Sequence, residues 1–442
     1  MLVLKNNRGV EDNRVRKMDY GVQINKTLYT RLIKNQHITL FSPNEVPGLY
    51  DAFFEDQEEF ERLYTQYEAD ETIRKKRVPA AELFSSLMQE RASTGRIYIM
   101  NVDHANTRSP FNPKKAPVHM SNLCAETILP TKPISYKNPE EGEISLCVLA
   151  AVNVGECNDM NELQKAGDIL VRALDALIDY QKYPVRAAEI STLNRRPLGI
   201  GMINYAYWLT KQGIRMSDDK AAPATHRLME HLQYATMKAS VDLAKEKGRC
   251  PWFDDLVMAD GLLPIDTYKR DIDAFCPPVY ECDWEGLREE IKEHGIRNST
   301  LTAMMPSETS SQISNATNGI EPPRSLVTVK ASKDGILKQV VPDILNLGLT
   351  YETLWELEDM EHYFRLMAVI QKFTCQSIST NTSYDPKRYP GEKVPMKVLL
   401  KDLTTAYKYG LKTLYYHHTR DGADDRQGDI EDDGCAGGAC KI

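Results

Sequence analysis

Apolar residues return at three- and four-residue spacing along much of the chain, which is the pattern of amphipathic helices. Helices are predicted at residues 50–74, 78–93, 161–181, 225–247, 284–294, 341–357, 363–378 and 396–409. Short apolar or β-branched runs between them predict strands at 96–102, 144–152, 198–205, 299–305 and 325–330. Helices alternating with short buried strands indicate an α/β fold with largely parallel pairing.

The last part of the chain has a different composition. Residues 419–442 contain many Asp and several Gly residues and almost no large apolar side chain. Such a segment buries too little surface to offset the entropy of ordering, so we expect a flexible tail. The sequence therefore predicts a folded domain over residues 1–418 and a tail over 419–442. The opening Leu2-Val3-Leu4 run resembles the middle of a domain more than its start.

Composition and charge narrow the function classes. The 442 residues include 55 Lys and Arg against 63 Asp and Glu, a net charge of −8 that argues against nucleic acid as the main partner. The apolar run 146–152 is too short to cross a bilayer, and Met1–Lys5 does not resemble a secretion signal. We therefore expect no membrane partner and a cytoplasmic location. The chain has nine cysteines, and both this odd number and the expected cytoplasmic location argue against a disulfide framework.

The first candidate site is Asn122-Leu-Cys-Ala-Glu126. An extended backbone would project Asn122, Cys124 and Glu126 to one face, with the thiol between an amide and a carboxylate. Such a trio can hold a substrate hydroxyl, abstract a hydrogen from the substrate and move the hydroxyl proton. The pattern alone favours the commoner case, a buried structural cysteine between polar groups.

The second candidate is Cys147, within a strand-like run. Cysteine is among the most buried residue types, so a core position is the commoner interpretation. The alternative is a redox thiol that faces the same pocket as Cys124. That role needs a second thiol, and no neighbour in this sequence is an obvious partner.

The third candidate is the loop Met305-Pro-Ser-Glu-Thr-Ser-Ser. Hydroxyl side chains at a helix start cap free backbone amides, and those amides and hydroxyls can also bind an anion. Ser307, Thr309, Ser310 and Ser311 are more hydroxyls than one cap requires. Capping and phosphate binding both remain open from the pattern.

Two further pairs of residues carry candidate chemistry. Tyr415 and Tyr416 lie at the end of a predicted helix, where such residues usually pack, but adjacent phenols can also pass an electron and a proton. Cys435 and Cys440 lie in a glycine-rich end without the second ligand pair of a zinc finger. An exchangeable dithiol fits this accessible position better.

These motifs, in this order, resemble the large (α) subunit of class I ribonucleotide reductase. The resemblance extends over residues 1–442 and includes the stretches 91–99 and 318–324. The two-cysteine tail favours the aerobic class Ia kind.

The resemblance implies a role for each pocket residue. Cys124 would be the transient thiyl radical that abstracts the 3′ hydrogen of a ribonucleoside diphosphate. Glu126 would take the 3′-hydroxyl proton, and Asn122 would orient the substrate. Cys147 would be one of the two thiols that reduce the 2′ carbon. The residues that would line the pocket or hold the phosphates are Leu149, Pro306, Ser307, Glu308, Thr309 and Ser310.

The resemblance also implies partners. Tyr415 and Tyr416 would relay the oxidising equivalent from a small radical-bearing subunit, whose metal-radical cofactor the enzyme depends on. No metal or cofactor would be bound by this chain directly. Cys435 and Cys440 would re-reduce the pocket disulfide and be recharged by thioredoxin or glutaredoxin.

The family's N-terminal part has no counterpart in this sequence, including the other pocket thiol. The implied fold is therefore the C-terminal part of a ten-stranded α/β barrel with Cys124 on a central finger loop, incomplete without an N-terminal partner chain. We expect the C-terminal chain of a split subunit, encoded by a bacterium or a phage, that is inactive alone.

Three alternatives remain from the sequence. A glycyl-radical enzyme shares thiyl chemistry, but the tail lacks an aromatic residue after its glycines. A thiol–disulfide carrier would use Cys435 and Cys440 and leave the other motifs without a purpose. A non-catalytic scaffold remnant would only bind the radical subunit.

Overall fold

The computed structural model describes residues 18–332 and 335–420. Its α-helices are α2 Lys26–Ile33, α3 Leu49–Glu55, α4 Gln57–Ala69, α5 Ala80–Thr94, α6 Val102–Thr107, α7 Met160–Tyr180, α8 Arg186–Arg195, α9 Tyr205–Lys211, α10 Ala221–Lys247, α11 Pro264–Thr267, α12 Trp284–His294, α13 Glu308–Ile313, α14 Ile344–Leu347, α15 Met360–Lys372 and α16 Met396–Lys408. Its strands are β1 Tyr20–Ile24, β2 His37–Phe41, β3 Lys75–Pro79, β4 Ile97–Asn101, β5 Val148–Asn153, β6 Leu198–Ile203, β7 Val327–Ser332, β8 Gly335–Val340, β9 Thr382–Tyr384, β10 Thr413–Leu414 and β11 His417–Thr419.

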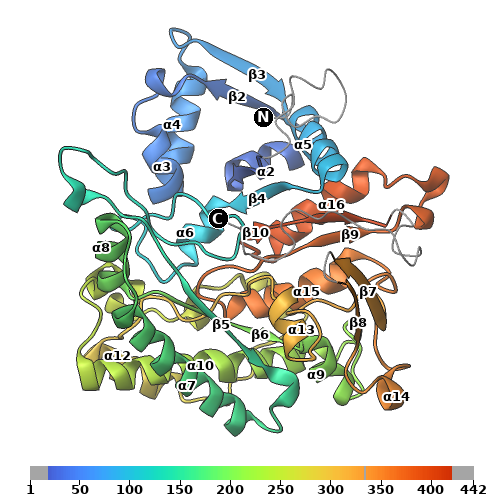
Figure 1. The fold of residues 1–442 in the computed structure, drawn as a ribbon. Helices are drawn as coiled ribbons and strands as arrows, with labels where there is room; N and C mark the ends of the chain where they lie inside the picture. The colour runs from blue at the N-terminus through green and yellow to red at the C-terminus, as the bar shows by residue number, and fades with distance from the viewer. Residues whose placement is uncertain (1–17, 333–334, 421–442) are drawn as a thin grey trace.

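A series of paired backbone segments crosses the middle of the molecule (Figure 1). β5 pairs in parallel with β6, and the segment 299–305 bridges β6 at Thr302 and the segment 376–380 at Met304, both in parallel. The amide of Tyr415, directly after β10, donates to the carbonyl of Thr380 at 2.7 Å. β10 is antiparallel to β4, and β4 is parallel to β1. The pairing is thus largely parallel with an antiparallel junction.

This series forms an incomplete barrel. Among the strands of the described residues, β1 and β5 each have a partner on one edge only, so the series does not close. Figure 1 shows α2–α5 and the antiparallel β2–β3 pair on one side of β4, with α7, α10 and α12 at the opposite end of the molecule. The predicted α/β class and the incomplete barrel are confirmed.

Most predicted helices are present near the expected residues. The helices α5, α7, α10, α12, α15 and α16 correspond to six of the eight predicted segments. The segment 50–74 is divided into α3 and α4 at Asp56, because the carboxylate of Asp56 accepts hydrogen bonds from the amides of Glu58 and Glu59 and begins a new helix.

The predicted helix at 341–357 is wrong. Within it only the four-residue helix α14 forms, and Asp343 before it has a φ of +50°. Gly348, a weak helix former, directly follows α14, and residues 348–357 form no further helix. The predicted helix at 363–378 is also too long, because α15 ends at Lys372 and residues 376–380 join the barrel series instead.

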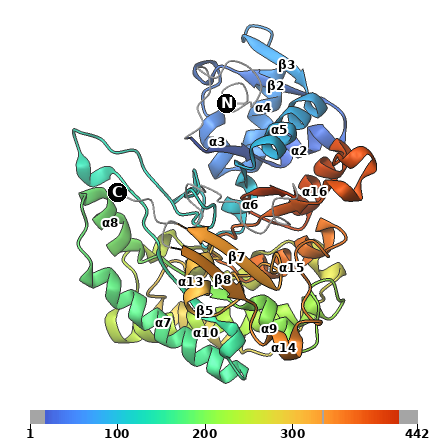
Figure 2. The ribbon, with the colours of Figure 1, turned by 45° about the vertical axis from the view of Figure 1, so that its right-hand side comes forward.

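The strand predictions differ from the structure in two ways. Residues 299–305 lie in the barrel series through isolated bridges, without forming a regular strand. Residues 325–330 fall in β7, which pairs antiparallel with β8 as a hairpin and not in parallel. The hairpin lies beside α13 (Figure 2), and Gln339 Nε2 donates to the carbonyl of Ala316, shortly after that helix, at 3.0 Å. The predicted boundary at 418/419 falls inside β11.

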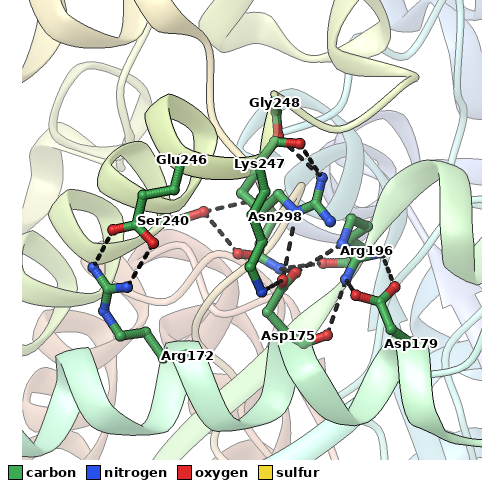
Figure 3. Close-up of polar contacts among 10 residues, drawn as sticks. Arg172, Asp175, Asp179, Arg196, Ser240, Glu246, Lys247, Gly248 and Asn298 are labelled. Carbon is green, nitrogen blue, oxygen red and sulfur yellow. Dashed lines mark hydrogen bonds and ion pairs between the residues drawn. The ribbon is translucent and has the colours of Figure 1, made fainter.

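A buried polar network connects α7 to the segments around it (Figure 3). Asp175, with no exposed surface, accepts from Arg196 Nε at 2.7 Å and from Asn298 Nδ2 at 3.1 Å. Burial alone would raise the pKa of Asp175, but the bonds and charges of Arg196 and Arg297 hold that pKa below its ordinary value. By contrast, Arg172 on α7 and Glu246 on α10 form a solvent-exposed ion pair.

Candidate active site

The segment that carries Cys124 is a tight turn closed by a bridge between Ser121 and Ile128. The amide of Ala125 donates to the carbonyl of Asn122 at 3.2 Å, and Ala125 has a φ of +66°. The prediction of an extended backbone here is therefore wrong. Asn122 and Glu126 still meet, because the turn places its two legs side by side: Asn122 Nδ2 donates to Glu126 Oε1 at 2.7 Å.

Hydroxyl and amide donors from the barrel series hold this 121–128 turn in place. Ser379 Oγ donates to the carbonyl of Cys124 at 2.6 Å, and the amide of Ser377 donates to the carbonyl of Glu126 at 2.9 Å. Thr413 Oγ1 donates to the carbonyl of Ala125 at 2.9 Å. These bonds come from two different segments and fix the backbone on both sides of the thiol.

Glu126 is a buried carboxyl with its side chain 2% exposed. Burial raises the pKa of Glu126 above its ordinary value, while hydrogen bonds from Asn122 and Ser379 oppose that rise. Ser379 Oγ lies 3.3 Å from Glu126 Oε2. A carboxyl whose affinity for a proton is raised in this way is suited to general-base chemistry.

Cys147 lies on the same side of the barrel series as the 121–128 turn. Burial, and to a lesser extent the charge of Glu126, raise the pKa of Cys147 to about 12. Gln376 Nε2 donates to its sulfur at 3.0 Å. The thiol form is therefore the stable one at neutral pH, which suits a group that gives up hydrogen.

Gly199 on β6 provides the space beside this thiol. A Cβ atom at Gly199 would lie 2.5 Å from Leu149 Cδ2 and 2.9 Å from Cys147 Sγ. Leu149 keeps 40% of its surface exposed. The structure thus brings Cys147 and Leu149 together at a point where any larger residue than glycine would displace them.

The two tyrosines follow the strand β10, and not the end of a helix as predicted. Tyr415 Oη donates to Cys124 Sγ at 3.6 Å, and the ring centroids of Tyr415 and Tyr416 lie 3.9 Å apart. Burial raises the pKa of Tyr415, so its hydroxyl keeps its proton. A chain of contacts therefore leads from Tyr416 through Tyr415 to the thiol.

The loop Pro306 to Ser310 begins where the barrel series ends. The amide of Ser379 donates to the carbonyl of Met304 at 3.0 Å, which places the start of the loop next to the segment that holds Glu126. Ser307 is buried and precedes α13, but its hydroxyl donates back to the carbonyl of Met305 at 3.1 Å and does not cap the helix. Glu308 is partly exposed, and Thr309 and Ser310 are exposed.

Three residues at this site received no role from the sequence: Tyr98, Gln376 and Ser379. Tyr98 packs against Tyr415 with centroids 4.8 Å apart. The alternation of Ser377 and Ser379 is a strand signal, but it lies at the end of a helix-like pattern and was masked by it. Cys435 and Cys440 lie outside the described residues.

The described residues also limit other interpretations. No disulfide joins any two of the seven cysteines in this part of the chain. Residues 18–332 and 335–420 contain no group of three or more His, Cys, Asp or Glu side chains arranged to hold a metal ion. None of the helices in this part of the chain has the length and apolar composition to cross a membrane.

Comparisons with known proteins identify the family. The model of the family described as "Ribonucleotide reductase, barrel domain" matches residues 1–350 and 346–417. The chain is 64% identical over 442 residues to the ribonucleoside-diphosphate reductase subunit alpha of Haemophilus influenzae, covering 100% of this chain and 58% of that protein.

Two further relatives agree. The chain is 64% identical over 446 residues to the ribonucleoside-diphosphate reductase 1 subunit alpha of Escherichia coli, and 47% identical over 450 residues to the subunit alpha of Enterobacteria phage T4. Each comparison covers 100% of this chain and 59% of the relative. The chain thus spans about three fifths of the length of these relatives, and it belongs to the ribonucleotide reductase barrel-domain family as the C-terminal portion of an alpha subunit.

Proposed function

We propose that this chain is the catalytic C-terminal part of a ribonucleoside-diphosphate reductase of the class Ia kind, with Cys124 as the hydrogen-abstracting thiol. The observation that carries the proposal is the contact between Tyr415 Oη and Cys124 Sγ at 3.6 Å. A phenol directly against a thiol, next to the bonded pair Asn122 and Glu126, provides a donor and acceptor for a hydrogen atom and a base in one pocket.

The reaction begins with hydrogen transfer inside the chain. An oxidising equivalent reaches Tyr416 from a separate small subunit, whose metal-radical cofactor supplies it. The oxidised Tyr416 takes the hydrogen atom of the Tyr415 hydroxyl, and the Tyr415 radical then takes the hydrogen atom of the Cys124 thiol and leaves a thiyl radical. The sulfur radical takes the 3′ hydrogen of the ribose, and the substrate becomes the radical.

The second half of the reaction is the reduction. Glu126 takes the 3′-hydroxyl proton, and the 2′-hydroxyl leaves as water. Cys147 and a second thiol supply two electrons and two protons and become a disulfide. Cys124 returns its hydrogen to the 3′ carbon and Glu126 returns the proton to the 3′ oxygen, so that one diphosphate and two thiols give one deoxyribonucleoside diphosphate, one disulfide and water.

Substrate placement follows from the pocket walls. Asn122 orients the ribose hydroxyls, and Leu149 and Pro306 line the pocket. The hydroxyls and amides of Ser307, Glu308, Thr309 and Ser310 hold the phosphates. The exposure of Thr309 and Ser310 supports this assignment, because both are open to a ligand.

The remaining partners complete the cycle. The second pocket thiol belongs to the N-terminal part of the alpha subunit. Cys435 and Cys440 reduce the pocket disulfide and are recharged by thioredoxin or glutaredoxin in the cytoplasm. This chain binds no metal ion or cofactor itself.

Reconstitution tests the proposal. The chain is combined with a candidate N-terminal chain and the radical subunit, and CDP reduction is assayed with thioredoxin. We expect dCDP only when all three components are present, and none with Cys124→Ser or Cys147→Ser. Reduction by this chain and the radical subunit alone would contradict the requirement for an N-terminal chain. Insulin reduction that survives Cys124→Ser but not Cys435→Ser, without CDP reduction, would favour a thiol–disulfide carrier instead.

A further inference from the structure

Gln376 is a buried residue that links the two parts of the candidate active site. It lies between α15 and β9 with none of its surface exposed. Its Oε1 accepts from the amide of Ile128 at 3.2 Å, and its Nε2 donates to Cys147 Sγ at 3.0 Å. One side chain thus connects the turn that carries Cys124 to the thiol of Cys147.

The orientation of this amide is fixed by its neighbours. The amide of Ile128 is a donor, so the Gln376 oxygen must face it. The nitrogen then faces the carbonyl of Leu198 at 3.0 Å and Thr300 Oγ1 at 3.2 Å, as well as the sulfur. Reversing the amide would set oxygen against the Leu198 carbonyl and nitrogen against the Ile128 amide. In the contact with Cys147, an N–H of the Gln376 side chain therefore donates to the sulfur.

The backbone of Gln376 is held as firmly as its side chain. Its amide donates to the carbonyl of Thr302 at 3.0 Å, and its carbonyl accepts from Lys412 Nζ at 2.7 Å. Lys412 is itself buried, with 1% of its surface exposed. Gln376 is therefore held in place independently of Cys147, so its side-chain amide sets the position of the sulfur.

We propose that Gln376 is the positioning residue of Cys147, whose amide N–H fixes the sulfur relative to the 121–128 turn and stabilises the negative charge that develops on it as the thiol loses its proton. The catalytic meaning of this inference rests on the proposed reductase function. The effect of Gln376 on the reactivity of the Cys147 thiol does not rest on that function, and it can be measured without substrate.

The electrostatic surroundings explain why such a donor is needed. Burial raises the pKa of Cys147, and the carboxylate of Glu126 raises it further. Hydrogen bonds from Gln376 and Thr127 lower it. A neutral donor can stabilise a transient charge on sulfur without adding a permanent cation beside Glu126, whose own charge the proposed reaction uses.

The test measures alkylation of Cys147 by iodoacetamide in the 442-residue chain, resolved by peptide mass spectrometry, between about pH 7.5 and 9.5. Only the thiolate reacts, so the rate at a fixed pH follows the thiol pKa. Gln376→Met keeps the length of the side chain and removes the donor. Gln376→Glu keeps an acceptor for the Ile128 amide and replaces the donor with a carboxylate. Cys157, a partly exposed thiol, is the reference in each digest.

Gln233→Met is the matched control. Gln233 is also fully buried and its Nε2 donates to a different sulfur, that of Cys375, at 3.6 Å. We expect Cys147 alkylation to become about tenfold slower in Gln376→Met, equal to about one pH unit, and slower still in Gln376→Glu. The Cys147 rate in Gln233→Met and the Cys157 rate in all variants should stay within about twofold of the parent.

The sign of the change separates positioning from loosened packing. A packing defect would expose Cys147 and speed its alkylation in both Gln376 variants. Faster or unchanged alkylation in a folded Gln376→Glu or Gln376→Met chain overturns the inference. In the reconstituted enzyme, the same variants should lower kcat and leave the KM for CDP within about twofold. Absence of reductase activity in the parent would instead count against the proposed function and leave the alkylation result valid.

Discussion

Tyr415 Oη donates to Cys124 Sγ at 3.6 Å, across 291 residues of sequence. The strand pair β10–β4 and the bond from the Tyr415 amide to Thr380 place the tyrosine, while Ser379 holds the carbonyl of Cys124. The contact therefore joins two independently anchored segments, and backbone hydrogen bonds fix the chain on both sides of it.

Replacing Tyr415 with Phe removes the hydroxyl and keeps the ring. We expect CDP reduction by the reconstituted enzyme to fall at least about 100-fold, because the hydrogen atom has no acceptor next to Cys124. The thermal midpoint should change little. Tyr351→Phe is the control, since that buried hydroxyl donates to the carbonyl of Pro342 away from the site. Retained activity in Tyr415→Phe would exclude a relay through this phenol.

Replacing Ser379 with Ala should move the acid limb of kcat/KM to higher pH. Burial already raises the pKa of Glu126, and the Ser379 hydroxyl opposes the rise by stabilising the carboxylate. Without it the pKa rises further, and the base is protonated at higher pH. The expected shift is about half to one pH unit. The neighbouring Ser377→Ala, whose hydroxyl lies 2.8 Å from Thr413 Oγ1, should leave the limb unchanged. An unshifted limb in Ser379→Ala would show that Glu126 is not the titrating base.

Replacing Gly199 with Ala should displace Cys147. The added Cβ would lie within 2.9 Å of its sulfur and 2.5 Å of Leu149 Cδ2, and such overpacking typically costs about 1–3 kcal/mol. We expect reduced kcat together with a lower free energy of unfolding. Gly21→Ala is the control, because a Cβ there meets nothing within 4 Å. Parent-like stability and turnover in Gly199→Ala would mean that the pocket is wider than the structure shows.

Replacing Asp175 with Asn should destabilise the chain by about 1–3 kcal/mol in urea unfolding, because the buried Arg196 loses one of its two carboxylate partners and keeps only Asp179. The exposed pair provides the control: Glu246→Gln should cost less than about 1 kcal/mol. Asp175 has a lowered pKa in the folded chain, so its contribution is present above the ordinary aspartate pKa of about 3.9 and is lost as the pH falls through the folded value. The difference between parent and Asp175→Asn should therefore shrink in acid. A pH-independent difference would assign the effect to packing.

The local patterns determined much of this protein. Apolar periodicity located α5, α7, α10, α12 and α16, because helices that bury one face repeat it in the sequence. The resemblance to the ribonucleotide reductase family, and not the residue types alone, assigned the motif at Asn122 to Glu126 and the Tyr415–Tyr416 pair to the candidate site. Periodicity failed at 341–357, where Asp343 has a positive φ before the helix and the helix ends already at Leu347, before Gly348.

Only the tertiary structure decided how these residues meet. The turn at 121–128, and not an extended strand, brings Asn122 to Glu126. Gln376 and Ser379 received no role from the sequence, because residues 376–380 lie at the end of a helix-like pattern there. In the structure these residues lie in the barrel series, next to the candidate site. The physical reason is that strand pairing and the bonds across it depend on partners far apart in the chain, while helical periodicity depends on neighbours three and four residues away.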